Sequence, residues 1–442
     1  MSPALSYTQI FSRAWPIILA NAAVPLLGLI DTAVIGNLGK TQDIGAIALG
    51  ALVFNFVYWS FGFLRMGTTG FTAQAAGAES WLEVRLVLGR AVLIAFSIAL
   101  LLLLLHRALG WTIFKLFQAS EAIESQANAY FNIRIWGAPA TLATFALLGT
   151  LVGLGKSRQL LWVQLFLNTL NAFLDILFAG IFDWGVTGIA WGTLISEYCA
   201  AIFAALVVYR VLRADQHQNT PFWSLPDVLD RTRLIAMLQA NRDIMIRTIL
   251  LVFSFAWFTN QGAQFGDATL AANHVLLQLI NFSAFFLDGY AFVAESIVGT
   301  AIGARRLKHF DLGIWRSSVM GAITALALAL LILGVGEFFI AALTDIINVR
   351  TLASRYLLFA ALYVVLSVAA FQLDGVFIGA VRSAEMRNAS IVATAVFLLC
   401  CEWFTQSYGN NGLWWAFIIY VVMRALCLLY YYPRIRKTLV QA

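Results

Sequence analysis

Apolar segments long enough to cross a lipid bilayer recur along the whole chain of 442 residues. A transmembrane helix needs about 20 mainly apolar residues. Hydrophobic residues make up 61% of the chain and charged residues only 11%, whereas soluble domains carry about 25% charged residues. Because so few charges cannot cover a water-facing surface, the sequence predicts an all-α polytopic membrane protein.

Turn residues and charge clusters divide the chain into twelve predicted transmembrane helices. Their approximate ranges are 10–38, 44–77, 84–105, 122–154, 159–182, 187–211, 242–266, 270–303, 312–343, 351–381, 388–407 and 412–432. Several ranges exceed a straight crossing, which indicates tilted or kinked helices. The start of the chain lacks the features of a cleaved signal peptide, so we expect the first span to be retained.

The basic residues indicate how these helices are oriented. Of the 28 Lys and Arg residues, 20 fall on one predicted side and six on the other, while Arg65 and Arg424 lie within spans. Cytoplasmic loops carry the excess of Lys and Arg, so both termini are expected in the cytoplasm. The net charge of +6 therefore reflects topology, and no nucleic-acid partner is predicted.

A polar segment near the middle separates two halves of six spans each. We predict an N-terminal six-helix bundle over residues 1–212, a cytoplasmic linker over 213–240 and a C-terminal six-helix bundle over 241–442.

The two halves are related in sequence. An offset of 226 residues pairs Gly149 and Gly153 with Gly375 and Gly379. With a shift of two residues, the segment WGVTGIAW (184–191) meets YGNNGLWW (408–415). An even number of spans in each half gives a parallel, pseudo-symmetric repeat, an arrangement that occurs in secondary transporters.

The sequence contains no motif for nucleotide binding or metal binding. The P-loop pattern GxxxxGK[ST] is absent, so we expect an ion gradient to drive any active transport and do not expect an enzyme. The cysteines lie in apolar segments without metal-ligand or disulfide spacing; they are Cys199, Cys400, Cys401 and Cys427. We predict no cofactor other than a coupling ion.

The first half contains acidic side chains within its apolar spans. Asp31 lies on the first span, and Asn171 and Asp175 lie four residues apart on the fifth, so that they share a helix face. Thr193 on the sixth span adds a hydroxyl group. Ionisable residues inside a membrane cost several kcal/mol, roughly 2.5–3.5 on insertion scales, and usually have a partner or a task. These four residues are therefore our candidate cation or proton site.

The chemistry of this cluster favours a proton over other occupants. Burial and a neighbouring carboxylate both favour the protonated form of a carboxyl group, so we expect one of the two aspartates to exchange a proton. The same oxygens could bind Na⁺ when both aspartates are ionised. The structural alternative is that the aspartates only join packed helices through hydrogen bonds.

Prolines interrupt the first span on the same helix as Asp31. Pro16 and Pro25 each remove a helix hydrogen bond and clash with the preceding turn. We therefore expect a bendable helix that converts protonation of Asp31 into movement, with a static kink as the alternative.

The second half lacks the same cluster. The partners of Asp31 and Asp175 at the 226-residue offset are Trp257 and Cys401. Its own intramembrane acids form a possible second site; they are Asp288, Glu295 and Asp374. Structural pairing with intramembrane arginines such as Arg424 is the alternative for these acids.

Several segments resemble the DinF branch of the MATE (multidrug and toxic compound extrusion) transporters over essentially the whole chain. They are WPIILANAAVPLLGLIDTAVIGNLG, LNAFLDILF, GVTGIAWGTLISEY, QANRDIMIR, LDGYAFVAE and LDGVFIGAVRSAEMRN. The resemblance implies two six-helix bundles and cation-coupled efflux of diverse, often cationic compounds. It also links Asp31, Asn171, Asp175 and Thr193 to ion coupling, and Pro16 to helix bending.

These observations together predict a secondary active multidrug efflux transporter. We expect a monomer, surrounded by lipid in a bacterial inner membrane, that exports amphipathic or cationic compounds in exchange for protons by alternating access. A Na⁺-coupled drug antiporter is one alternative. A lipid-linked precursor flippase of the same superfamily is another, although only Arg65 and Arg424 could offer intramembrane charge to a pyrophosphate.

Overall fold

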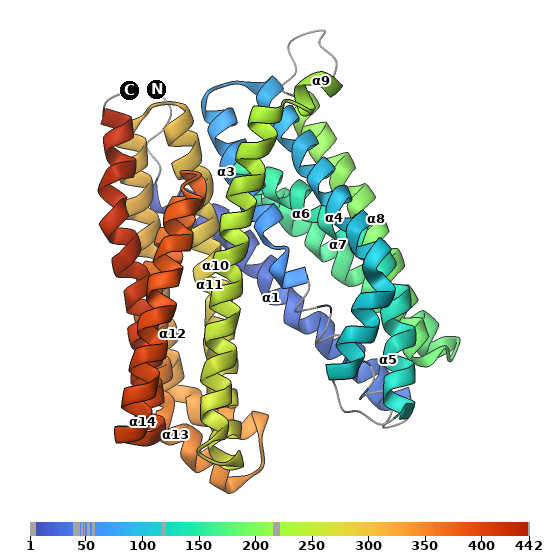
Figure 1. Cartoon of the computed structure of the whole chain (residues 1–442), viewed down its shortest axis with the longest axis vertical. Helices are drawn as coiled ribbons and strands as arrows, with labels where there is room; N and C mark the ends of the chain where they lie inside the picture. The colour runs from blue at the N-terminus through green and yellow to red at the C-terminus, as the bar shows by residue number, and fades with distance from the viewer. Residues whose placement is uncertain are drawn as a thin grey trace. The chain divides into compact units, whose positions relative to one another are not determined.

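A computed structural model describes residues 6–38, 45, 47, 49, 50, 54, 58–116, 121–214 and 222–440. The side chains of 24–38, 113–116, 121–122 and 214 lie outside this description. Within the described residues, all regular secondary structure is helical (Figure 1). The predicted all-α fold class is confirmed.

The helices follow the predicted order of spans. In the first half they are α1 (Tyr7–Leu38), α3 (Phe63–Gly77), α4 (Trp81–Leu116), α5 (Glu121–Arg134), the 3₁₀ helix η1 (Ile135–Gly137), α6 (Ala138–Gly153), α7 (Ser157–Asp175), the π-helix η2 (Ile176–Ile181) and α8 (Gly185–Ala214). From the linker onward they are α9 (Leu225–Val228), α10 (Arg231–Ala263), α11 (Asp267–Gly303), α12 (Leu307–Leu343), α13 (Ile347–Gly379) and α14 (Ser383–Val440).

Nine helical segments of the described chain are long and apolar enough to cross a membrane. The last of them, α14, contains two predicted spans, because its backbone leaves the helical conformation at Gly409, where φ is +57°. The first predicted span corresponds to α1, which is helical across both prolines. The fold is therefore that of a polytopic helical membrane protein.

The chain forms two compact units. One comprises residues 1–18, 77–79 and 237–442, and the other comprises 19–76 and 80–236. In the first unit, α11 packs against α12 and α13, and α13 packs against α14; in the second, α8 packs against α5, α6 and α7 (Figure 1). The start of α1 belongs to the first unit, where Ile10 and Ile17 join a buried cluster with Tyr290 of α11. The predicted bundle limits at residues 212 and 241 stay a prediction.

The sequence repeat is visible in equivalent helix contacts within each unit. A Cβ atom at Gly149 would collide with the backbone carbonyl of Arg65, and one at Gly375 would collide with that of Ala291. Each pair is separated from its counterpart by the 226-residue offset. The glycines one turn further on, at 153 and 379, make equivalent backbone contacts. Small residues spaced four apart let membrane helices approach closely, so both units use the same packing device.

The turns after these helices also correspond. Gly155 has φ +65° and its counterpart Val381 has φ +55°. In both turns the next residue donates its N–H to a carbonyl five residues back: Lys156 to Leu151 at 2.8 Å, and Arg382 to Phe377 at 2.9 Å. This is the left-handed ending that commonly stops an α-helix. The repeat therefore fixes backbone conformation as well as sequence.

Candidate functional site

Two helices of the second unit come into backbone contact beside Asp175. Gly188 and Gly192 lie four residues apart on α8, facing the end of α7 and the start of η2. A Cβ atom at Gly188 would lie 2.8 Å from the backbone nitrogen of Ala179, and one at Gly192 would collide with Oδ1 of Asp175. The segment GVTGIAWG therefore supplies a close helix crossing that holds the Asp175 carboxyl against α8. The sequence repeat includes this segment, but only the structure shows its contact with Asp175.

The described part of the predicted polar cluster is assembled at this crossing. Asn171 and Asp175 are fully buried, and Thr193 is 6% exposed. The amide of Asn171 donates from Nδ2 to Oγ1 of Thr193 at 3.1 Å, and the Thr193 hydroxyl donates to the carbonyl of Ile189 at 2.9 Å. Among the described residues, Oδ1 of Asn171 accepts no hydrogen bond. The structure thus brings together three of the four residues that the sequence nominated.

The helix that carries Asp175 changes its geometry immediately after this residue. Residues Ile176–Ile181 form a π-helix, and Phe182 donates its N–H to the carbonyl of Leu177 at 2.9 Å. This π-helix ends the helix, because a bend follows at Phe182 and α8 begins at Gly185. The residues of this segment, ILFAGI, resemble an ordinary apolar helix, so their pattern gave no signal for the irregularity.

The remaining predicted residues of the coupling apparatus belong to α1. Asp31 and Pro25 lie in the helical backbone, but their side chains are outside the described residues. Pro16 is buried in the part of α1 that belongs to the first unit. The proposed bending of α1 at its prolines stays a prediction.

The equivalent positions of the first unit show how the repeat arranges this region. Trp257 and Cys401, the counterparts of Asp31 and Asp175, have neighbouring side chains. Cys401 is fully buried on α14. The repeat therefore places these two positions next to each other in the half where they are apolar.

Aromatic rings occupy the other equivalent positions. Asn171 corresponds to Phe397, and Thr193 corresponds to Phe417 with the two-residue shift. The ring centroids of Phe397 and Phe417 lie 6.0 Å apart, and Phe258 is fully buried against Phe417 at 4.5 Å. Where the second unit has a hydrogen-bonded polar pair, the first unit has a packed aromatic core.

The structure places the acids that were predicted as a possible second site on α11 and α13. Asp374 forms ion pairs with Arg247 and with Arg424, the latter at 2.6 Å, and all three residues are buried. Two guanidinium groups on one carboxylate oppose the binding of a further cation there. Glu295 is 1% exposed on α11, and Asp288, seven residues before it, is half-buried. A binding role for these acids stays a prediction.

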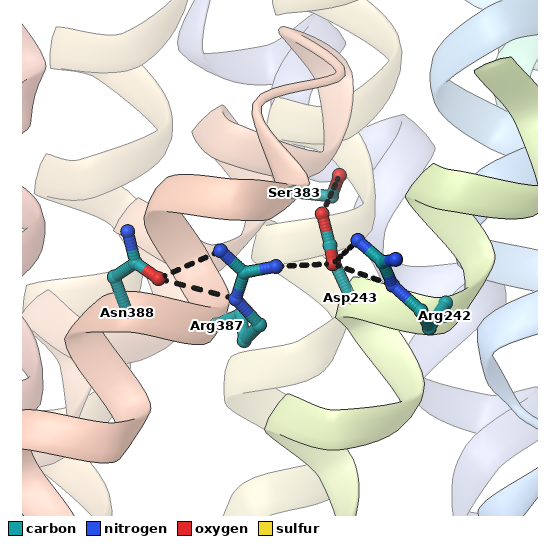
Figure 2. Close-up of polar contacts among 5 residues, drawn as sticks. All are labelled: Arg242, Asp243, Ser383, Arg387 and Asn388. Carbon is teal, nitrogen blue, oxygen red and sulfur yellow. Dashed lines mark hydrogen bonds and ion pairs between the residues drawn. The ribbon is translucent and has the colours of Figure 1, made fainter.

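A second ionic network in the first unit joins residues 242 and 243 of α10 to the start of α14 (Figure 2). Asp243, 4% exposed, accepts hydrogen bonds at Oδ1 from Arg387 at 2.8 Å and from Arg242 at 3.0 Å. Ser383 donates to its Oδ2 at 3.4 Å, and Arg387 also donates to Asn388. The motifs QANRDIMIR and LDGVFIGAVRSAEMRN, far apart in sequence, therefore meet through their charged residues.

Comparison with known proteins identifies the family. The MatE family model matches residues 16–177 and 244–403, which is most of both halves. The chain belongs to the MatE family. The MatE relative "DNA damage-inducible protein F" of Escherichia coli (strain K12) is 36% identical over 94% of this chain and 89% of its own length. The resemblance to the DinF branch is thereby confirmed.

More distant MatE relatives agree with this assignment. The "Probable multidrug resistance protein NorM" of Acinetobacter baylyi is 24% identical over 61% of this chain and 60% of its own length. The crystal structure of the Vibrio cholerae MATE transporter VcmN in the bent form has a TM-score of 0.86, with 19% identity, over 98% of this chain and 97% of that chain. This likeness shows the shared fold. The protein is thus a multi-pass membrane protein of a family of multidrug and toxin extrusion transporters.

Proposed function

We propose that this MatE protein exports amphipathic and cationic compounds in exchange for protons, and that the polar cluster of the second unit is its coupling site. The observation that carries the proposal is the fully buried Asp175, held against Gly192 beside the Asn171–Thr193 hydrogen bond. A buried carboxyl beside polar side chains such as those of Asn171 and Thr193 can change its charge with proton binding. A carboxyl group that served only to pack the helices together would not need to bind and release a proton.

Asp31 is proposed as the second acid of this cluster. Its counterpart Trp257 is a neighbour of Cys401, the counterpart of Asp175. Because both halves repeat the same glycine contacts and turns, we infer that Asp31 also neighbours Asp175. Two nearby carboxyl groups in a low-dielectric site disfavour a double negative charge and can share one proton.

The proposed cycle needs only competition between proton and substrate. A ligand shifts a conformational equilibrium when it prefers one of the two states. Protonation of the Asp31–Asp175 pair from outside would favour release of the substrate, with bending of α1 near Pro16 and Pro25, and deprotonation toward the cytoplasm would restore substrate binding. The excess of basic residues on one predicted side supports cytoplasmic termini, and the Escherichia coli relative supports placement in a bacterial inner membrane.

Na⁺ coupling is the second candidate, because Asn171 Oδ1 is buried without a hydrogen-bond donor among the described residues. Amide and carboxylate oxygens together are suitable ligands for a hard cation. Na⁺ coupling predicts that transport requires a Na⁺ gradient, whereas proton coupling predicts that it requires a pH gradient.

The test is dye efflux from proteoliposomes under separately imposed pH and Na⁺ gradients. We expect the wild-type protein to respond to the pH gradient alone, and Asp31→Asn and Asp175→Asn to lose that response. Asp311→Asn, which alters an exposed acid paired with Arg436, is the matched control and should transport normally. Undiminished pH-driven efflux in either cluster variant would refute the proposal, and efflux driven by Na⁺ at equal pH would support the second candidate.

A further inference from the structure

A buried ion pair lies one helical turn from the polar cluster, on the same helix. Glu197 follows Thr193 by four residues on α8, which places both on one face with a rise of about 6 Å between them. Oε1 of Glu197 accepts an ion-pair contact from Nη1 of Arg134, at the end of α5, at 2.8 Å. Both side chains are about nine-tenths buried. The proposed coupling mechanism does not use either residue.

The partner of this pair lies where α5 changes into α6. The helix tightens into the 3₁₀ turn Ile135–Gly137 directly after Arg134. The hydroxyl of Tyr198 donates to the carbonyl of Trp136, within this turn, at 2.9 Å. Gly137 lies directly against the carboxylate, because a Cβ atom at this position would collide with Oε2 of Glu197.

These five residues form a clamp between α8 and the α5–α6 junction; they are Arg134, Trp136, Gly137, Glu197 and Tyr198. One charged contact, one hydrogen bond and one steric contact hold two successive positions of α8. Neither side of the clamp can rotate without breaking at least one of them. The clamp therefore restrains the orientation of α8 about one turn from Thr193 and Gly192.

Polar and aromatic side chains surround the ion pair between Glu197 and Arg134. Its other polar neighbours are Thr141 and the phenols of Tyr58 and Tyr198. The hydroxyl of Thr141 lies beside both Glu197 and Tyr58. The guanidinium of Arg134 lies over the ring of Phe54 at 5.1 Å. A buried charge that loses its partner is strongly unfavourable, so the two residues act as one unit.

We propose that Glu197 is a positioning residue which, through Arg134 and the Tyr198 tether, sets how closely α8 encloses Asp175 and hence the pH at which transport turns over. This inference rests on the proposed proton coupling at Asp175. When the clamp is released, α8 can move away from Asp175 and water can reach the carboxyl. Hydration favours the charged form, so the pH midpoint of efflux moves to a lower value.

Three variants distinguish an effect of the position of α8 from a direct electrostatic effect of Glu197 or Arg134 on Asp175. Glu197→Gln removes the ion pair. The double variant R134Q/E197Q removes it while leaving no unpaired charge, and Tyr198→Phe removes only the tether to the Trp136 carbonyl. Tyr198 is 42% exposed, so the last change is mild for folding. Tyr408→Phe, at an exposed tyrosine of the other unit, is the matched control.

The experiment measures the pH midpoint of dye efflux in proteoliposomes for each folded variant. Positioning predicts a shift of about one pH unit downward for both glutamate variants, the size of displacement that protein environments commonly impose. It predicts a smaller shift in the same direction for Tyr198→Phe and none for Tyr408→Phe. If either glutamate variant does not fold, Tyr198→Phe decides the test.

The inference is overturned if R134Q/E197Q has the wild-type midpoint, because the charge and not the tether would then matter. It is also overturned if Tyr198→Phe has the wild-type midpoint. In both cases loss of pH-driven efflux in Asp175→Asn would leave the proposed function intact. Efflux that is independent of pH in the wild type would instead remove the proposed function, and this inference with it.

Discussion

Adding one methyl group at Gly192 tests whether the close contact between α8 and Asp175 is needed for function. The new Cβ would collide with Oδ1 of Asp175 and would lie 3.2 Å from the backbone nitrogen of Asp175 and the carbonyl carbon of Leu174. The carboxyl can turn away, but the two backbone atoms can move only with the helix. We therefore expect Gly192→Ala to separate α7 from α8 by a few tenths of an ångström and to reorient Asp175.

The expected cost follows from two opposing effects. Overpacking a well-packed helix contact costs about 1–3 kcal/mol, whereas replacing glycine by alanine inside a helix gains about 1 kcal/mol in helix propensity. The net change should therefore be about 0–2 kcal/mol of destabilisation, which leaves the protein folded. Transport should be reduced far more than stability, because the methyl group acts directly on the proposed proton site.

The assay compares thermal unfolding in detergent with pH-driven dye efflux in proteoliposomes. Gly334→Ala is the matched control, since a Cβ atom at this helical position would meet no atom within 4 Å. The control should gain about 1 kcal/mol of stability and keep full transport. If Gly192→Ala transported like the wild type at every pH, the contact between Gly192 and Asp175 would have no role in coupling, and the reasoning would be refuted.

Three further changes test individual contacts of the first unit. Asp374→Asn should lower the unfolding temperature far more than Asp311→Asn, since it leaves two buried arginines without a carboxylate, a loss of about 3–5 kcal/mol for a buried ion pair. Val381→Gly should raise stability by about 1 kcal/mol, because a β-branched residue at φ +55° is strained and the repeat uses Gly155 there; an unchanged unfolding temperature would contradict this. Asn273→Ala should cost about 1–3 kcal/mol, because it removes an amide that exchanges two hydrogen bonds with the amide of Asn410 and accepts a third from a buried tryptophan; thermal unfolding with intact membrane insertion measures the loss.

Local patterns were sufficient for much of the fold. The length of an apolar segment predicts a transmembrane helix, because the bilayer core offers no hydrogen-bond partners to backbone N–H and C=O groups. A helix satisfies these groups within the segment itself. The 226-residue offset predicted the paired glycines at 149, 153, 375 and 379, which the structure places at equivalent close contacts. Asn171 and Thr193, on different helices, were predicted to share a polar cluster, and the structure joins them by a hydrogen bond. Their role in ion coupling stays a prediction.

Other features depended on how the helices pack. Nothing in the residues ILFAGI indicates a π-helix, and only the structure shows that this segment packs against Gly188 of α8. The sequence identified Asp374 as a possible cation ligand, but only the packing of α10, α13 and α14 brings Arg247 and Arg424 to its carboxylate.

The sequence by itself determined the membrane-spanning helices, the duplication and the residue types of the polar cluster, because these depend on hydrophobic length and on chemistry that each residue carries locally. The tertiary structure decided which charges pair, how the clamp of Arg134 and Glu197 fixes α8, and how Gly192 encloses Asp175. Contacts between residues on different helices depend on the rotation and separation of whole helices. The rotation and separation of the helices depend on all the packing contacts together, so no single residue of the sequence predicts them.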